Sequence, residues 1–195
     1  VRNLDRVPSL AVRAKSRNDF VTQVDLGAES EIIRTIRKAY PDHAILAEES
    51  GLSAGAQSGA RGASDVTWIV DPLDGTTNFL HRIPHFAVSI GIQVKDRLEH
   101  GVIYAPATQD LYCASRGEGA LLNNRKLRVS ACKELTQALI GTGVPLQEEY
   151  LDRYLPMMRN VAAHTAGVRR AGAAALDLAY VAAGRLEGFW ELNLN

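Results

Sequence analysis

Cysteine is scarce in this chain, and long apolar runs are missing. The two cysteines, Cys113 and Cys132, are too few for the disulfide framework of a small secreted domain, and such usage is typical of a reducing compartment. The longest apolar stretch, 171–184, is shorter than the roughly 18 residues that a membrane-spanning helix needs, and Asp177 interrupts it. The sequence therefore predicts a cytoplasmic protein that makes no membrane contact.

An excess of charge of either sign is also missing, because 22 Lys and Arg residues balance 22 Asp and Glu residues. A neutral chain has no overall basic field with which to hold nucleic acid, so we expect no direct nucleic-acid binding. Apolar residues make up 46% of the chain, which is enough to build a core and excludes disorder as the main state. By its length, the chain suits a single domain, 1–195.

Hydrophobic periodicity predicts a mixture of helices and strands. A capping box from Thr22 to Asp25 predicts the start of a helix over 21–41, and alternating apolar residues predict an antiparallel meander over 86–128. The segment 51–64, rich in Gly, Ser and Ala, is expected to be a loop. The remaining elements are expected as strands at 44–47, 67–70 and 186–192 and as helices at 148–163 and 172–183. The fold class that follows is α/β or α+β, with sheets covered by helices.

Three acids stand at the ends of predicted strands. Glu48 follows the strand 44–47, and Asp71 and Asp74 follow the strand 67–70 in a segment that Pro72 is expected to hold as a turn. Carboxylates that converge on one sheet edge repel each other unless a cation neutralises them. Oxygen ligands without a nearby Cys or His favour Mg²⁺ or Mn²⁺. The three acids therefore predict a site for a hard divalent cation.

A candidate anion site follows the acids directly. The segment 75–78, Gly-Thr-Thr-Asn, offers backbone N–H groups at a predicted helix start, which is a suitable place for a phosphate. Acids beside an anion site suggest metal-assisted phosphoryl chemistry. Asp-Pro and Asp-Gly are also common turn dipeptides, so Asp71 and Asp74 alone would fit a turn equally well. Glu48 and the Gly-Thr-Thr run favour the functional interpretation.

These residues carry a resemblance to a known family. The motif DPLDGTTNF at 71–79, preceded by WIV at 68–70, resembles the signature of the inositol monophosphatase family. The segments EESG at 48–51 and GAAALDLA at 172–179 are similar to other segments of that family. The resemblance runs over nearly the whole chain and is closest to the bacterial SuhB-type members.

The resemblance implies a layered α/β/α/β/α sandwich, a homodimer, and Mg²⁺-dependent, Li⁺-sensitive hydrolysis of phosphate monoesters with two or three ions. The implied substrate is a small phosphorylated polyol, first of all a myo-inositol monophosphate. Histidinol phosphate, a nucleoside 3′,5′-bisphosphate and fructose 1,6-bisphosphate stay open as alternatives. A function of another class also stays open, because some SuhB-type relatives bind the transcription machinery and this chain could be a binding module of that kind.

The resemblance also assigns roles residue by residue. It implies that the catalytic residues are Thr76, which holds the attacking water, and Asp25, which pairs with Thr76. The implied metal ligands are Glu48, Asp71 as the bridging ligand, the main-chain carbonyl of Leu73, and Asp74. The implied substrate contacts are Leu73, Asp74, Gly75, Thr76, Arg169, Gly172, Ala173, Ala174 and Glu191. Asp25 could instead be a helix cap. Arg169 and Arg170, just before the helix expected over 172–183, could contact the substrate or a partner subunit, or form surface ion pairs.

One expected residue lies outside the sequence. The family has a further aspartate in a Trp-Asp motif shortly after the position of Glu191, and the chain stops at Asn195. Its N-terminal helix is expected before Val1, which is itself not a methionine. We therefore expect the chain to be part of a longer protein with an N-terminal helix and a C-terminal α/β part.

Overall fold

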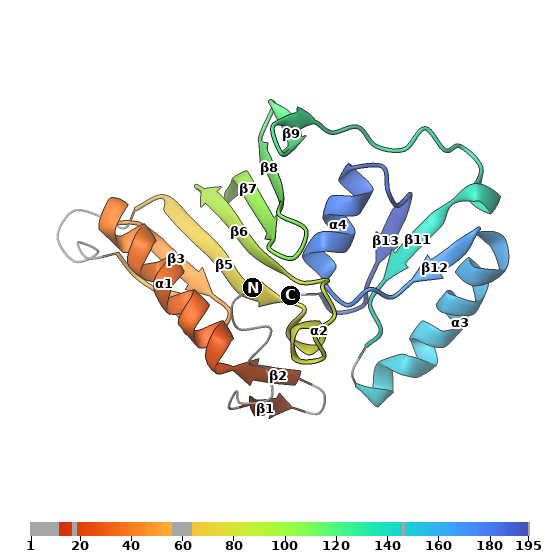
Figure 1. Cartoon of the computed structure of the whole chain (residues 1–195), viewed down its shortest axis with the longest axis horizontal. Helices are drawn as coiled ribbons and strands as arrows, with labels where there is room; N and C mark the ends of the chain where they lie inside the picture. Colours follow the sequence, from red (N-terminus) through yellow and green to blue (C-terminus); the bar gives the residue numbers. More distant parts are fainter. Residues whose placement is uncertain (1–11, 17–18, 56–63, 146, 195) are drawn as a thin grey trace.

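A computed structural model describes the backbone of residues 12–16, 19–55, 64–145 and 147–194, with side chains from Gln23 onward. These residues form five layers, in which helices and sheets alternate (Figure 1). The helices are α1 (Gln23–Ala39), α2 (Thr76–Leu80), α3 (Glu148–His164) and α4 (Ala174–Ala182), with a 3₁₀ turn at Leu135–Gln137. The layered α/β sandwich implied by the resemblance is confirmed.

The large sheet has eight strands in the order β10-β9-β8-β7-β6-β5-β3-β4. Neighbouring strands in this sheet are antiparallel, except that β3 and β5 are parallel. The meander expected over 86–128 forms five of these strands. The strands are β3 (Ala44–Ala47), β4 (Gly51–Ser53), β5 (Val66–Asp74), β6 (Ala87–Val94), β7 (Arg97–Ala105), β8 (Asp110–Ser115), β9 (Gly119–Leu122) and β10 (Arg125–Lys126).

The small sheet has three parallel strands in the order β12-β11-β13. Parallel neighbours need a crossover connection, and here α3 joins β11 to β12 while α4 joins β12 to β13. The strands are β11 (Leu139–Thr142), β12 (Gly167–Arg169) and β13 (Gly188–Trp190). A separate antiparallel pair, β1 (Val12–Ser16) and β2 (Asp19–Thr22), precedes α1.

Helix α1 covers one face of the large sheet (Figure 1). Its Ile36 is buried against Ile45 and Val70, and Ile32 and Ile33 pack on the same cluster. Asp25 stands in the first turn, and Arg37 and Lys38 stand in the last, as the helix dipole favours. Thr22, the first residue of the expected capping box, lies outside the described side chains.

Helix α4 lies between the two sheets, because it contacts β6 and β7 on one side and β11 and β13 on the other. Leu176 and Ala179 are buried together with Ala87, Ala105 and Tyr112 of the large sheet. The small side chains of α4 allow this close approach. Residues 174–182 are thereby fixed between the two sheets, and the N-terminus of α4 is brought to the end of β5.

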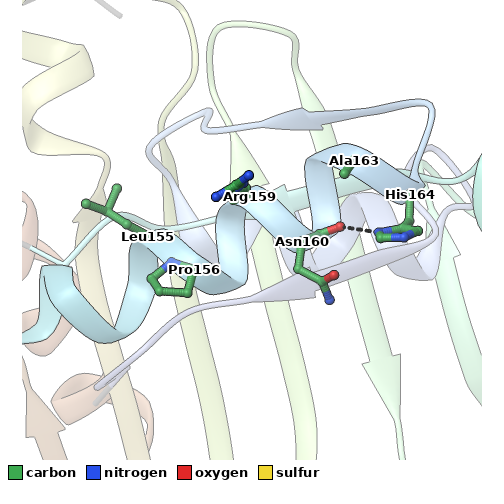
Figure 2. Close-up of a pocket in the computed structure, with 6 residues that line it drawn as sticks. All are labelled: Leu155, Pro156, Arg159, Asn160, Ala163 and His164. Atoms are coloured by element: carbon green, nitrogen blue, oxygen red, sulfur yellow. Dashed lines mark hydrogen bonds between the residues drawn. The ribbon is translucent and has the colours of Figure 1, made fainter.

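Helix α3 forms an outer layer against β12. A shallow groove of about 500 Å³ runs along its surface, where His164 Nδ1 lies 2.8 Å from the Asn160 carbonyl oxygen (Figure 2). Its lining residues are Leu155, Pro156, Arg159, Asn160, Ala163 and His164. Helix α3, which carries this groove, lies on the far side of the small sheet from α4 (Figure 1).

Several local predictions were wrong. The expected loop 51–64 begins with the short strand β4, and its residues 56–63 lie outside the described part of the chain. The segment containing Asp71 and Asp74 is the end of β5 rather than a turn. The helix expected over 172–183 starts at Ala174, because Gly172 has a positive φ of 87°. Among the described residues, no helix is long and apolar enough to cross a membrane.

Candidate active site

Three of the acids predicted from the sequence lie at the ends of adjacent strands. The parallel strands β3 and β5 pair Ala47 with Val70, so Glu48 and Asp71 follow the same point in both strands. A bulge in β5 between Asp71 and Asp74 shifts the register against β6. A bulge bends the strand and redirects side chains, which allows both aspartates to serve one edge of the sheet.

Burial and neighbouring charge change the acidity of both aspartates. Burial, together with the negative charges of Glu48 and Asp74, raises the pKa of Asp71 to about 8. Burial also raises the pKa of Asp74 to about 6, against the backbone N–H groups of Ala175 and Ala174, which lower it. Each negative charge makes it more costly to ionise the neighbouring carboxyl groups, so this end of the sheet favours a neutralising cation.

The chemistry of this donor set fits a hard divalent ion. All the donors are carboxylate or carbonyl oxygens, which Mg²⁺ and Mn²⁺ prefer, and Glu48 is within hydrogen-bonding reach of Asp71. Across the described part of the chain, no three His, Cys, Asp or Glu side chains already form a metal-binding group. Asp71 Oδ1 accepts a hydrogen bond of 3.0 Å from the Leu73 N–H. The ligand types fit Mg²⁺, while the side chains are not arranged as a closed cage.

Thr76 lies between an acid of α1 and the end of β5. Its Oγ1 is 2.9 Å from Asp25 Oδ1 and 3.1 Å from the Leu73 carbonyl oxygen. Asp25 is 1% exposed, although it stands in the first turn of a helix where acids are usually solvated. The structure thus brings together the two residues to which the resemblance assigned catalytic roles. Asp25 serves a contact 51 residues away in the sequence.

Gly75 and the start of α2 adjoin the segment before α4. Gly75 caps α2 with a φ of 93°, a left-handed conformation that favours glycine. A Cβ at Gly75 would lie 3.0 Å from the His85 carbonyl oxygen and 3.3 Å from the Ala173 Cβ atom. The predicted substrate residues Gly75, Thr76, Gly172 and Ala173 are therefore close neighbours in the fold.

Asn78 ties this arrangement together, and the sequence did not indicate it as a positioning residue. Its Nδ2 donates to the His85 carbonyl at 2.7 Å and to the Ala171 carbonyl at 2.9 Å, with the Gly172 carbonyl at 3.3 Å. Asp74 makes a parallel link, because its Oδ2 accepts from the Ala175 N–H at 2.8 Å. The end of β5 and helix α2 are thus joined to the start of α4 and the segment before it by partly buried hydrogen bonds.

A second group of charged residues, Asp177, Glu191 and Arg170, interacts electrostatically near Asp74. Burial raises the pKa of Asp177 to about 7, as do the charges of Asp74 and Glu191, while Arg170 lowers it. Burial raises the pKa of Glu191, and Arg170 again opposes the rise. The Glu191 carboxylate occupies the space that a side chain at Gly143 would fill. The sequence indicated Glu191. Asp177 lies inside the segment GAAALDLA at 172–179 but was given no role there, and Gly143 lies in no motif.

The two arginines before α4 differ in their surroundings. The Arg169 Nη1 atom donates to the Val168 carbonyl at 3.0 Å, within its own strand. Arg170 is the arginine whose charge acts on Asp177 and Glu191. The sequence indicated both arginines as possible substrate contacts and included Arg169 among the site residues, and of the two it is Arg170 whose charge acts on these acids.

Comparison with known proteins shows which family the chain resembles. The model of the "Inositol monophosphatase family" matches residues 3–195. "Nus factor SuhB" of Pseudomonas aeruginosa is 52% identical over 197 residues, covering 100% of this chain and 71% of that protein. "Nus factor SuhB" of Escherichia coli K12 is 46% identical over 194 residues, covering 99% of this chain and 70% of that protein.

Solved structures show the same fold. The extragenic suppressor protein suhB from Bartonella henselae superposes with a TM-score of 0.93 at 47% identity, covering 100% of this chain and 72% of that one. Inositol monophosphatase from Anabaena superposes with a TM-score of 0.76 at 40% identity, covering 88% of this chain and 66% of that one.

Proposed function

Because the chain belongs to the inositol monophosphatase family, which supports phosphatase chemistry, we propose that it catalyses the Mg²⁺-dependent hydrolysis of a phosphate monoester. The proposed substrate is a myo-inositol monophosphate. The observation that carries this proposal is the position of Thr76, hydrogen-bonded to Asp25 at one end of β5 beside Asp71 and Asp74. A hydroxyl next to clustered carboxylates supports water attack on a phosphate held with a cation.

The proposed roles follow from the chemistry of each group. Glu48, Asp71, Asp74 and the Leu73 carbonyl would hold Mg²⁺, which when bound lowers the pKa of water and neutralises phosphoryl charge. When the Thr76 hydroxyl donates its proton to Asp25, the lone pairs of Oγ1 can accept a hydrogen bond from the attacking water. The backbone N–H groups of Gly75 and Thr76 are proposed to hold the phosphate.

The proposed polyol contacts lie on the other side of Asp74. Glu191 is an acceptor for neighbouring hydroxyls, since a carboxylate offers two oxygens. Gly172, Ala173 and Ala174, at the start of α4, are the proposed neighbours of the sugar-like ring. Histidinol phosphate, nucleoside 3′,5′-bisphosphate and fructose 1,6-bisphosphate are the alternative substrates.

The decisive test is phosphate release from inositol 1-phosphate in the presence and absence of Mg²⁺. Turnover should require Mg²⁺ and should be suppressed by Li⁺. Asp71→Asn should abolish turnover and weaken Mg²⁺ binding in titration calorimetry, because it removes a charge shared with Glu48 and Asp74. Asp152→Asn, on the exposed surface of α3, is the matched control and should leave both unchanged. Unaltered Mg²⁺ affinity in Asp71→Asn would refute the metal assignment.

A second function is favoured by the names of the relatives. Proteins called Nus factor SuhB are 46% and 52% identical to this chain, so association with the transcription machinery through a protein surface is the alternative proposal. The two functions separate in one variant. Asp71→Asn protein that has lost phosphatase activity should still be retained by transcription complexes in a pull-down. No retention of the wild-type protein under the same conditions would count against this second function.

A further inference from the structure

Helix α1 carries a second buried acid besides Asp25. Glu29 is 4% exposed and stands four residues after Asp25, so both side chains project from one face of the helix. Asp25 contacts Thr76, but Glu29 has no role in the proposed reaction. An acid is rarely buried to this degree unless it is paired or hydrogen-bonded, so its partner is informative.

That partner is the turn after β3. Glu29 Oε2 accepts a hydrogen bond of 2.8 Å from the backbone N–H of Glu49. The N–H of the preceding residue, Glu48, donates to the Val70 carbonyl at 3.0 Å. Two successive backbone N–H groups are thus hydrogen-bonded, that of Glu48 to β5 and that of Glu49 to α1. Together they fix the backbone from which the Glu48 side chain projects.

We infer that Glu29 is a positioning residue for Glu48 and thereby sets the affinity of the site for its divalent cation. The inference rests on the proposed function, in which Glu48 is a metal ligand. Helix α1 then supports the site at two points of one face, because Asp25 is hydrogen-bonded to Thr76 and Glu29 is hydrogen-bonded to the turn that contains Glu48. Groups that orient metal ligands typically change metal affinity by about 10- to 100-fold when they are removed.

The test compares three substitutions at this position. Glu29→Ala removes the acceptor, Glu29→Asp withdraws the carboxylate by one methylene, and Glu29→Gln keeps an oxygen that can accept the Glu49 N–H. We expect the Mg²⁺ concentration for half-maximal activity to rise about 10- to 100-fold in Glu29→Ala, while kcat at saturating Mg²⁺ changes little. Glu29→Gln should restore most of the affinity. Calorimetry with Mg²⁺ alone should show the same order, and hydrogen exchange of the Glu49 amide should be faster in Glu29→Ala.

Two controls separate the possible failures. Glu31→Ala removes an exposed acid of α1 that pairs with Arg34, and it should change none of these readouts. Glu48→Gln removes the proposed ligand itself. If Glu48→Gln weakens Mg²⁺ binding while Glu29→Ala and Glu29→Asp do not, the positioning role is wrong and the proposed function stands. If Glu48→Gln has no effect either, the metal assignment fails and the inference fails with it.

A purely structural role would give another result. In that case Glu29→Ala would lower kcat, through loss of folded protein, without shifting the half-saturating Mg²⁺ concentration, and this would also overturn the inference. If Glu29→Ala does not fold, Glu29→Asp carries the same comparison, because it retains the charge and shortens only the reach to Glu49.

Discussion

At the scale of single residues, the site depends on side chains that hold backbone rather than substrate. Asn78 is 6% exposed and directs its amide N–H groups at carbonyl oxygens before β6 and before α4. The residue lies inside the nine-residue motif at 71–79. Its place there is explained by packing between distant segments, with no need for a contact to substrate.

Asn78→Asp should therefore be strongly destabilising. The new carboxylate cannot donate, and it would face the carbonyl oxygens of His85 and Ala171 without a partner. We expect a loss of roughly 3 kcal/mol or more in the free energy of unfolding, measured by urea titration. Asn160→Asp on exposed α3 makes the same chemical change and should cost less than about 0.5 kcal/mol. Equal losses in the two variants would contradict the structural role of Asn78.

His85 leads to a pH prediction. Burial lowers the pKa of His85 from 6.5, and its Nε2 has no hydrogen-bond partner among the described residues. The unfolded chain therefore binds a proton more readily than the folded chain, so this residue costs stability as the pH falls below 6.5.

His85→Phe should remove that cost. The ring can keep the edge-on contact with Tyr180, whose centroid is 5.8 Å away. Relative to wild type, the variant should gain unfolding free energy as the pH falls below 6.5, because it has no buried imidazole to protonate. Urea titrations between pH 8 and pH 5 measure the difference. Parallel curves for the two proteins would mean that His85 does not titrate differently on folding.

At the scale of elements, the parallel ends of β11 and β13 set the position of Glu191. Gly143 follows β11, and its N–H donates to the Trp190 carbonyl at 3.2 Å. The Glu191 carboxylate fills the space beside the Gly143 Cα atom. The Glu191 carboxylate, after β13, can therefore take this position only because the residue after β11 is a glycine.

Gly143→Ala should displace the Glu191 carboxylate without unfolding the protein, because the atoms in conflict are the end of a flexible side chain. We expect kcat/KM for inositol 1-phosphate to fall about tenfold relative to an aryl phosphate. Glu191→Gln should produce the same change in selectivity. Gly188→Ala is the matched control in β13, since its Cβ would meet Ile140 at an ordinary 3.4 Å. Unchanged selectivity in Gly143→Ala would remove Glu191 from the specificity argument.

The sequence predicted the long periodic elements and missed several short ones. The helix expected over 21–41 and the meander over 86–128 were confirmed because their periodicity extends over many residues. Strands β4, β11 and β12 have three or four residues, and their pairing depends on partners that no local pattern identifies. The acids of the motif could be found in the sequence, but Glu29 and Gly143 could not. Their roles arise from residues that are distant in the chain.

At the scale of the whole molecule, local and distant contacts are unevenly distributed. The meander from β6 to β10 pairs each strand with the next one in the sequence. The links that close the candidate site instead join Asn78 to Ala171 and Asp74 to Ala175, across 93 and 101 residues. Contacts between distant residues require the closure of long loops, which costs more conformational entropy than a hairpin does.

This difference predicts an order of folding. Val102→Ala, within the meander, should mainly slow folding, whereas Asn78→Ala should mainly accelerate unfolding. The folding φ-value, which is the change in activation free energy of folding divided by the change in stability, should therefore be higher for Val102→Ala than for Asn78→Ala. Stopped-flow refolding and unfolding in urea measure both rates. A higher φ-value at Asn78 would reverse the order.

The hydrogen bonds that join β5 and α2 to the start of α4 therefore also bear on the order in which parts of the protein fold and unfold. Segments joined late in folding are also expected to separate early when the native protein opens. The catalytic arrangement would then be lost in fluctuations that leave the large sheet paired, so that inactivation precedes unfolding. The half-life of activity, rather than the melting of the sheet, would limit the working lifetime of the protein.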